Sequence, residues 1–185
     1  MIDPIVKEGG KLIFGPCRLS FPSLFEKKKF DGDAGDGKYM VTALIPKNEK
    51  ATVAAIEEAI EAAKKQGLTS KWNGKLPKKL TLPLVDGDDT DDEYAQGHFT
   101  VKAKTNMRPT VTNRKGEPIV DEEEIYGGVW ALLSVNFFPY NTAGNSGVAV
   151  ALNAVRKFKD DEPFGSNSAH DFDDIDLDNE DDDDL

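Results

Sequence analysis

Two stretches of the sequence, VWALLSVNFFPYN at residues 129–141 and SGVAVALNAVRKF at residues 146–158, decide the fold class. Both are rich in β-branched and aromatic residues, which favour the extended conformation of a strand. The four residues between them, TAGN, contain a glycine and an asparagine, which are typical of tight turns. The sequence therefore predicts an antiparallel hairpin in this part of the chain.

Three shorter stretches are also expected to be strands: LIFG at residues 12–15, KYMVTALIP at residues 38–46 and HFTVKAKT at residues 98–105. In each, β-branched or aromatic residues alternate with small or polar ones, and Gly or Pro lies at a boundary. The third alternates most regularly, because Phe99 and Val101 share one face whereas Lys102 and Lys104 share the other. We therefore expect a strand with a core side and a cationic side.

One amphipathic helix is predicted within residues 48–67, NEKATVAAIEEAIEAAKKQG. Its apolar positions follow helical spacing: Val53, Ile56, Ile60 and Ala63. Asn48 is the candidate N-cap and Gly67 the candidate stop. We expect the Ala and Ile stripe to pack against a sheet.

Long connections separate these elements. Residues 18–37 are aromatic and basic and end in a glycine-rich turn, and residues 70–97 are a polar stretch with lysines around Trp72. Five strands, one helix and no alternation of strands with helices predict a mainly β fold, a small antiparallel barrel with long loops, rather than a nucleotide-binding α/β fold.

The charge of the chain is divided unevenly along its length. The 185 residues include 23 Lys and Arg against 34 Asp and Glu, a net charge of -11. Residues 160–185 hold 13 of the acids and no base, so residues 1–159 carry the other 21 acids and all 23 bases, a net charge of +2. A polyanionic segment with few apolar residues does not bury enough surface to offset its ordering entropy. We therefore expect one folded domain over residues 1–159 and a disordered acidic tail over residues 160–185.

Two roles fit the acidic tail: it keeps the protein soluble, or it imitates another polyanion and contacts basic partners. The residues that would make such contacts are the following: Asp171, Asp173, Asp174, Asp176, Asp178, Asp181, Asp182, Asp183, Asp184 and Leu185.

Several kinds of chemistry find no support in the sequence. Cys17 is the only cysteine and there are two histidines, which excludes a disulfide framework and argues against a zinc site. GDAGDGKY at residues 32–39 departs from the phosphate loop, because Tyr39 stands where Ser or Thr must bind magnesium. DGDDTDDE at residues 86–93 lacks the glycine and glutamate offsets of a calcium loop. We expect no catalytic residues, no cofactor and no metal.

The N-terminus has no signal-peptide pattern and no long apolar run occurs, so a cytosolic protein without membrane contact is expected.

Cations and aromatic residues recur together along the chain, as in proteins that bind single-stranded nucleic acid by phosphate contacts and base stacking. Phe14, Phe99, Trp130 and Phe137 are expected in the core, whereas Phe138 and Tyr140 share the opposite face of their strand. The candidate phosphate contacts are Arg18, Lys71, Lys75, Lys78, Lys79, Lys102, Lys104 and Arg108. The candidate stacking residues are Phe21, Phe25, Trp72, Phe138 and Tyr140.

Several order-specific segments resemble a known family: RLSFPSLFE, KYMVTALIPK, YAQGHFTVKAKT, YGGVWALLSVNFFPYNTAGNSGVAVALNAVRKF and EPFG. They are similar to a family of phage proteins, formerly a domain of unknown function, whose members are single-stranded DNA-binding proteins. The resemblance implies an OB-fold, the five-stranded Greek-key barrel, with one inserted helix. A more distant similarity, through VNFFPY and the acidic C-terminus, is to the replisome single-stranded DNA-binding proteins of short-tailed phages. The tails of those proteins usually end in an aromatic residue used in partner contacts, whereas this chain ends in Leu185.

The resemblance implies a protein that coats single-stranded DNA during phage replication, recombination and repair in the cytoplasm of the infected bacterial host. The tail is expected to compete with DNA for its groove and to contact a polymerase, helicase or nuclease. A homodimer fits this function, and the sequence does not fix the oligomeric state. The alternatives are an acidic-tailed interaction scaffold or DNA mimic that binds basic partners, and a metal-dependent hydrolase that uses residues 86–92.

Overall fold

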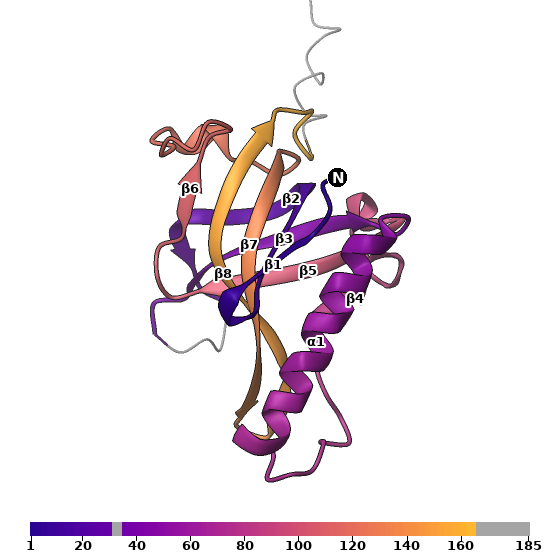
Figure 1. The fold of residues 1–185 in the computed structure, drawn as a ribbon. Helices are drawn as coiled ribbons and strands as arrows, with labels where there is room; N and C mark the ends of the chain where they lie inside the picture. Colours follow the sequence, from indigo (N-terminus) through magenta and orange to yellow (C-terminus); the bar gives the residue numbers. More distant parts are fainter. Residues whose placement is uncertain (31–34, 166–185) are drawn as a thin grey trace, which may run out of the picture.

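Five strands of the computed structural model, which describes residues 1–30 and 35–165, close into a barrel (Figure 1). They are β2 (Lys11–Lys28), β3 (Lys38–Pro46), β5 (His98–Thr105), β7 (Trp130–Thr142) and β8 (Asn145–Lys159). Antiparallel pairing runs from β5 through β3, β2 and β7 to β8, and one parallel pair, Lys104 opposite Ala151, joins β5 to β8. The structure confirms the mainly β barrel, and its strand order is that of an OB-fold.

Shorter strands and 3₁₀ helices accompany the five barrel strands. The additional strands are β1 (Ile5–Lys7), β4 (Leu84–Asp86) and β6 (Thr110–Thr112). The short 3₁₀ helices are η1 (Glu8–Gly10), η2 (Gly87–Asp89), η3 (Glu93–Ala95) and η4 (Glu122–Glu124). Residues 71–97 contain β4, η2 and η3 and otherwise lack regular structure, which confirms the long polar connection expected there.

The predicted hairpin is confirmed as β7 and β8, which extend beyond the barrel. Residues 130–136 of β7 pair with β2 on one side and with β8 on the other. From Phe137 to Thr142 β7 pairs with β8 alone, so the end of the hairpin is two-stranded and projects alongside α1 (Figure 1). This projecting end shapes the candidate site.

The barrel interior is filled by alternating residues of these strands. Phe14, Leu133 and Val135 are among its fully buried side chains, and Val101 and Ala103 form the core side of β5, as predicted. Phe99 and Trp130 are half-buried rather than fully enclosed, and Phe137 packs against the edge of the core. Alternation therefore identifies the buried face better than it predicts how deeply each aromatic residue is buried.

The helix α1 (Lys50–Ser70) packs on the barrel through Ile56, Ile60 and Ala63, as its spacing predicts. Both predicted ends are wrong. Glu49 occupies the N-cap position and no side chain caps the helix. Gly67 lies inside the helix, where a Cβ atom would stand 2.5 Å from Cζ3 of Trp72, so it permits close packing rather than ending the helix.

The strand β2 is longer than predicted, because most of the expected connection after residue 17 continues as strand to Lys28. Its pairing with β3 shifts register between Ser20 and Ser23 and again before Lys28. At the first shift Phe21 has a φ of 48°, in the left-handed region that a residue with a side chain rarely adopts. Bulges of this kind break the alternation by which a strand is recognised in a sequence.

Within the described ranges, no helix combines the length and the apolar character needed to cross a membrane.

Candidate nucleic-acid interface

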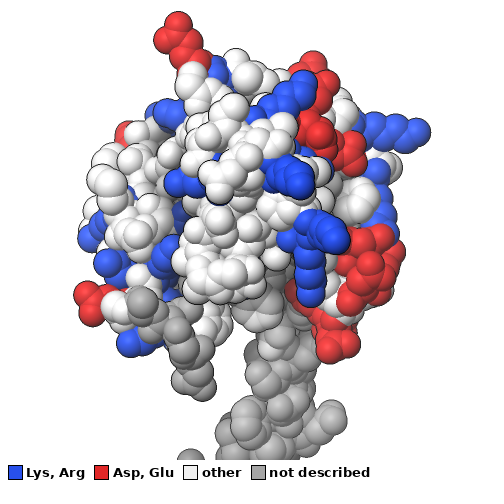
Figure 2. Space-filling view, turned by 90° about the horizontal axis from the view of Figure 1, so that it is seen from below, with Lys and Arg blue, Asp and Glu red and all other residues white. Residues whose placement is uncertain are grey.

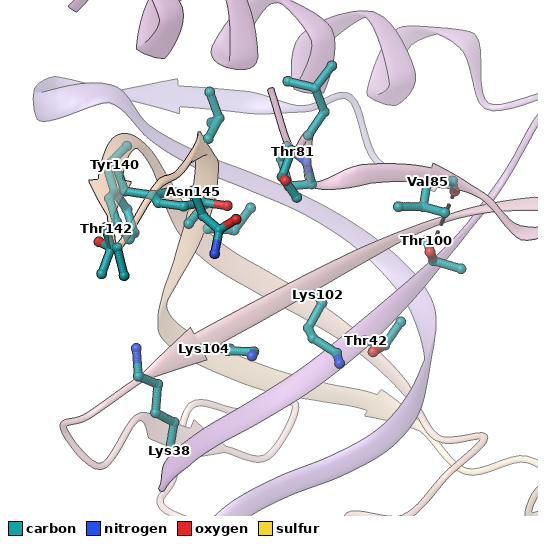
Figure 3. A pocket seen from close by; sticks show the side chains of 17 residues that line it. Lys38, Thr42, Thr81, Val85, Thr100, Lys102, Lys104, Tyr140, Thr142 and Asn145 are labelled. Carbon is teal, nitrogen blue, oxygen red and sulfur yellow. Dashed lines mark hydrogen bonds between the residues drawn. The ribbon is translucent and has the colours of Figure 1, made fainter. Parts of the chain in front are cut away.

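A groove of about 910 Å³ lies between the projecting hairpin and the face of the barrel formed by β3 and β5 (Figure 3). Three segments line it: the outer face of β3 and β5, the end of the β7–β8 hairpin, and the connection from Thr81 to Val85. It is therefore assembled from parts of the chain that are far apart in the sequence.

Lysine side chains form one wall of this groove. Lys38 comes from the start of β3, and Lys102 and Lys104 come from the outward face of β5, as the alternation of that strand predicts. In Figure 3 the three side chains lie together on the side opposite the hairpin. Lys102 also lies over the ring of Phe30, 5.6 Å from its centroid. Lys38 was not predicted, although its place two positions after the turn residue Asp36 and at the start of a strand is visible in the sequence.

Aromatic side chains form the facing wall. Phe138 and Tyr140 both line the groove, and Phe138 is 42% exposed. Pro139 between them is buried on the opposite face of β7. Phe137 packs toward the core, which confirms that Phe137 and Phe138 face opposite sides and that Phe138 and Tyr140 share one.

The chemistry of the groove favours a polyanion with planar groups. Among the described residues that line it, none is acidic, and the remaining polar groups include Thr42, Thr100 and Asn145. Seen from the end of the hairpin, Lys and Arg side chains surround a largely uncharged central surface, and most acidic side chains in view lie toward one edge (Figure 2). Cations along a backbone path beside exposed aromatic faces are the features of a single-strand nucleic-acid groove.

The family model described as the ssDNA-binding protein of Enterobacter phage Enc34 matches residues 10–185. The chain belongs to this family. A family of single-stranded DNA-binding proteins has a non-enzymatic function, in agreement with the prediction that the chain is not an enzyme.

Solved structures agree with this membership. The chain is similar to the single-stranded DNA-binding protein from bacteriophage Enc34 in complex with ssDNA, with 30% identity, a TM-score of 0.78 and coverage of 88% of this chain and 94% of that one. For a C-terminal truncation of the Enc34 protein, the identity is 29%, the TM-score 0.76, and the coverage 88% and 93%. Gp2.5 of bacteriophage T7, a single-stranded DNA-binding protein, shares the fold at 21% identity and a TM-score of 0.56, with coverage of 88% and 98%. No match was found among curated proteins.

Not all predicted stacking residues of this Enc34-family chain lie in the groove. Trp72 is 6% exposed, and its ring packs against Gly67, which Cβ of Pro139 also approaches. Its indole Nε1 donates a hydrogen bond to the carbonyl oxygen of Tyr140 at 3.2 Å. The prediction that Trp72 offers a face to a base is wrong for this conformation. The lysines that surround it in the sequence are exposed but do not line the groove: Lys71, Lys75, Lys78 and Lys79.

Phe21 and Phe25 also lie away from the groove. Phe21 is 69% exposed and lines a separate hollow with Asp91, Asp92 and Glu93, whose charges oppose the approach of phosphate. Phe25 packs partly against the core, and the guanidinium of exposed Arg108 lies 6.0 Å from its ring centroid. The sequence places these aromatic residues beside cations, whereas the fold separates them from the lysine wall.

Arg18, a predicted phosphate contact, does not line the groove and instead holds the end of the described chain. Its Nε donates to the carbonyl oxygen of Gly128 at 2.8 Å, and a terminal nitrogen donates to that of Glu162 at 2.7 Å. Its guanidinium also lies 4.4 Å from the ring centroid of Phe164. With its donors used in this way, Arg18 acts as a structural anchor.

Further contacts fasten residues 160–165 to the barrel. Phe164 stacks on Tyr94 with a centroid distance of 4.0 Å. Trp130 Nε1 donates to Asp161 at 2.7 Å, and this hydrogen bond is the main reason why the pKa of Asp161 is lowered. The segment therefore lies within the range predicted as tail but contacts the barrel. The remaining tail residues, including the predicted partner contacts from Asp171 to Leu185, lie outside the described residues.

The acidic cluster considered for metal-dependent hydrolysis is occupied by a lysine. Lys47 Nζ lies 2.7 Å from Asp86 and 2.6 Å from Asp88, and its hydrogen bonds lower the pKa of both carboxyl groups. In the part of the chain that the structure describes, no three His, Cys, Asp or Glu side chains are grouped to hold a metal ion.

Proposed function

We propose that this chain binds single-stranded DNA without sequence preference, in the groove between the lysine wall and the aromatic wall. The observation that carries the proposal is the position of Lys38, Lys102 and Lys104 opposite Phe138 and Tyr140 in one groove of an Enc34-family chain. Lysines contribute affinity through phosphates, and stacking tolerates any base because every base has a π-face. The protein would therefore coat and protect single strands.

The two walls also suggest how the strand would lie. The phosphates would follow the lysine side of β3 and β5, and the bases would turn toward Phe138 and Tyr140 on the hairpin. The groove offers few hydrogen-bonding side chains besides threonines and Asn145, which fits stacking rather than base-edge readout.

We further propose that the acidic tail competes with DNA for this groove. Residues 160–165 are fastened near Trp130, eight residues along β7 from Phe138, which corresponds to roughly 26 Å of strand. The 20 residues after Gly165 span up to about 70 Å when extended. The chain is therefore long enough for the tail to reach the groove from its anchor, where it would act as a tethered, weaker polyanion.

When DNA displaces the tail, its carboxylates would become free to contact basic surfaces of a polymerase, helicase or nuclease. This arrangement suits phage DNA replication, recombination and repair in the cytoplasm of the infected bacterial host, by a monomer or a homodimer.

The test is fluorescence anisotropy of labelled oligo-dT with the full chain and with a chain that ends at Gly165, across a salt series. Ending at Gly165 keeps the anchored segment intact. We expect salt-dependent binding by both and tighter binding by the shorter chain. Absence of binding by both at low salt would refute the DNA-binding proposal and favour a scaffold or DNA mimic whose tail binds basic proteins. Equal affinity of the two chains would refute only the competition by the tail.

A further inference from the structure

The aromatic wall of the groove stands on the weakest part of the sheet. Phe138 and Tyr140 lie where β7 pairs with β8 alone, beyond the last residue that pairs with β2. An isolated two-stranded hairpin is marginally stable in water. Rings that are to stack on bases must nevertheless be held in place before binding, because ordering them on binding costs free energy. Another part of the chain must therefore support this end of the hairpin.

The connection from Lys71 to Pro83, which we call the brace, supplies this support at two points. On β7, Trp72 donates its hydrogen bond to the carbonyl of Tyr140, and the Asn141 side chain donates to the carbonyl of Lys71 at 3.4 Å. On β8, the backbone of Thr81 donates to Ser146 and accepts from Val148, each at 3.0 Å. The brace thus ties both strands of the hairpin.

Trp72 is the central contact of the brace. A Cβ atom on Gly67 would stand 2.5 Å from the Trp72 ring and 2.8 Å from Cβ of Pro139, so the glycine lets the indole and the proline pack directly on α1. Pro139 separates Phe138 from Tyr140 and faces away from the groove. The contact of Trp72 therefore fixes the backbone from which both groove rings project.

We infer that Trp72 is a positioning residue for DNA binding: it orients the aromatic wall through Pro139 and the Tyr140 carbonyl and contacts no base itself. The inference rests on the proposed function and deepens it. Trp72 then affects the part of the affinity that depends on bases and leaves the part that depends on phosphates unchanged.

The experiment compares the affinity for oligo-dT with the affinity for an abasic oligomer of the same length and charge. The ratio of the two affinities isolates the contribution of the bases. Trp72→Phe removes the indole donor and part of the packing. Trp130→Phe is the matched control, because it removes an indole N–H at the tail-anchoring end of the barrel, where the hydrogen-bond partner is Asp161. Thermal melting establishes that each variant is folded.

We expect Trp72→Phe to lower the ratio at least about threefold, which is less than the roughly fivefold or greater loss expected when one stacked base is lost entirely. The abasic affinity and the salt slope should not change. Trp130→Phe should leave the ratio at the wild-type value. In a chain that already carries Phe138→Ala and Tyr140→Ala, Trp72→Phe should have no further effect on the ratio, because no ring is left to position. If Trp72→Phe acted only by destabilising the protein, it would weaken binding to both oligomers, both in the wild type and in the chain with Phe138→Ala and Tyr140→Ala.

A second variant covers the case in which Trp72→Phe does not fold. Gly67→Ala adds one methyl group against the Trp72 ring, and alanine otherwise favours a helix more than glycine does. It should also lower the ratio. Suppose that the wild-type ratio is well above one and that Gly67→Ala and a folded Trp72→Phe both keep this ratio. This result would overturn the inference, while the proposed function would stand. A wild-type ratio of about one, or no binding, would overturn base stacking in the groove and the inference with it.

Discussion

The lysine wall makes a quantitative prediction about salt. Replacing Lys38, Lys102 and Lys104 by Gln removes the three cations that line the groove. Each phosphate contact on a single strand contributes about 0.7 to the slope of log affinity against log salt, so the triple variant should have a slope smaller by about 2. Between 50 and 200 mM salt, the wild type should therefore lose roughly twentyfold more affinity than the variant.

The assay is anisotropy with labelled oligo-dT at a series of salt concentrations, and it needs a control for net charge. Replacing Lys7, Lys50 and Lys65 by Gln changes the net charge equally at exposed positions that do not line the groove. This control should keep nearly the wild-type slope. If the slope of log affinity against log salt fell by the same amount in both triple variants, binding would depend on overall charge. The assignment of phosphates to the lysine wall would then be wrong.

Three further outcomes follow from the structure. Phe138→Ala and Tyr140→Ala should each weaken oligo-dT binding by about 1–3 kcal/mol in the same assay, whereas Phe21→Ala should leave it unchanged. The reverse pattern would place the site at the separate hollow that Phe21 lines. The Trp130 hydrogen bond lowers the pKa of Asp161 in the folded chain. The contribution of Asp161 to folding stability is therefore fully present above its ordinary pKa of about 4 and is lost as the pH falls through the lowered value. Trp130 fluorescence should change over that pH range in the wild type and should not change there in Asp161→Asn. Burial raises the pKa of the Cys17 thiol to about 12, so a thiol reagent at pH 8 should react only after denaturant is added, and rapid labelling of the folded chain would contradict its burial.

The regular parts of the fold could be predicted because their local patterns agree with their burial. The ranges of β3 and β5 follow directly from alternation, and the helical stripe of α1 identifies its packed face. β2 could not be predicted in full, because its register shifts and the left-handed Phe21 interrupt the alternation. Gly67 was misread for a related reason: a glycine that ends a helix and one that admits a neighbouring ring look alike in a sequence.

The candidate site was predictable in composition but not in arrangement. Lys102, Lys104, Phe138 and Tyr140 lie on alternating strands, so their outward direction is visible in the sequence, and they do meet in one groove. Arg18 and Trp72 also combine the expected residue types. However, Arg18 donates to the carbonyl of Glu162, and the Trp72 ring packs against Gly67 and donates to the carbonyl of Tyr140. Such contacts join residues far apart in the chain, and no local pattern reveals them.

Locating bound DNA on the protein would show whether the bases lie against the aromatic wall of the groove. Photo-crosslinking of an oligo-dT that carries 5-iodouracil, followed by mass spectrometry of the crosslinked peptides, identifies the residues next to the bases. We expect crosslinks to Phe138 and Tyr140, and we expect them to disappear when unlabelled oligo-dT competes. Crosslinks concentrated at Phe21 or elsewhere outside the groove would contradict it.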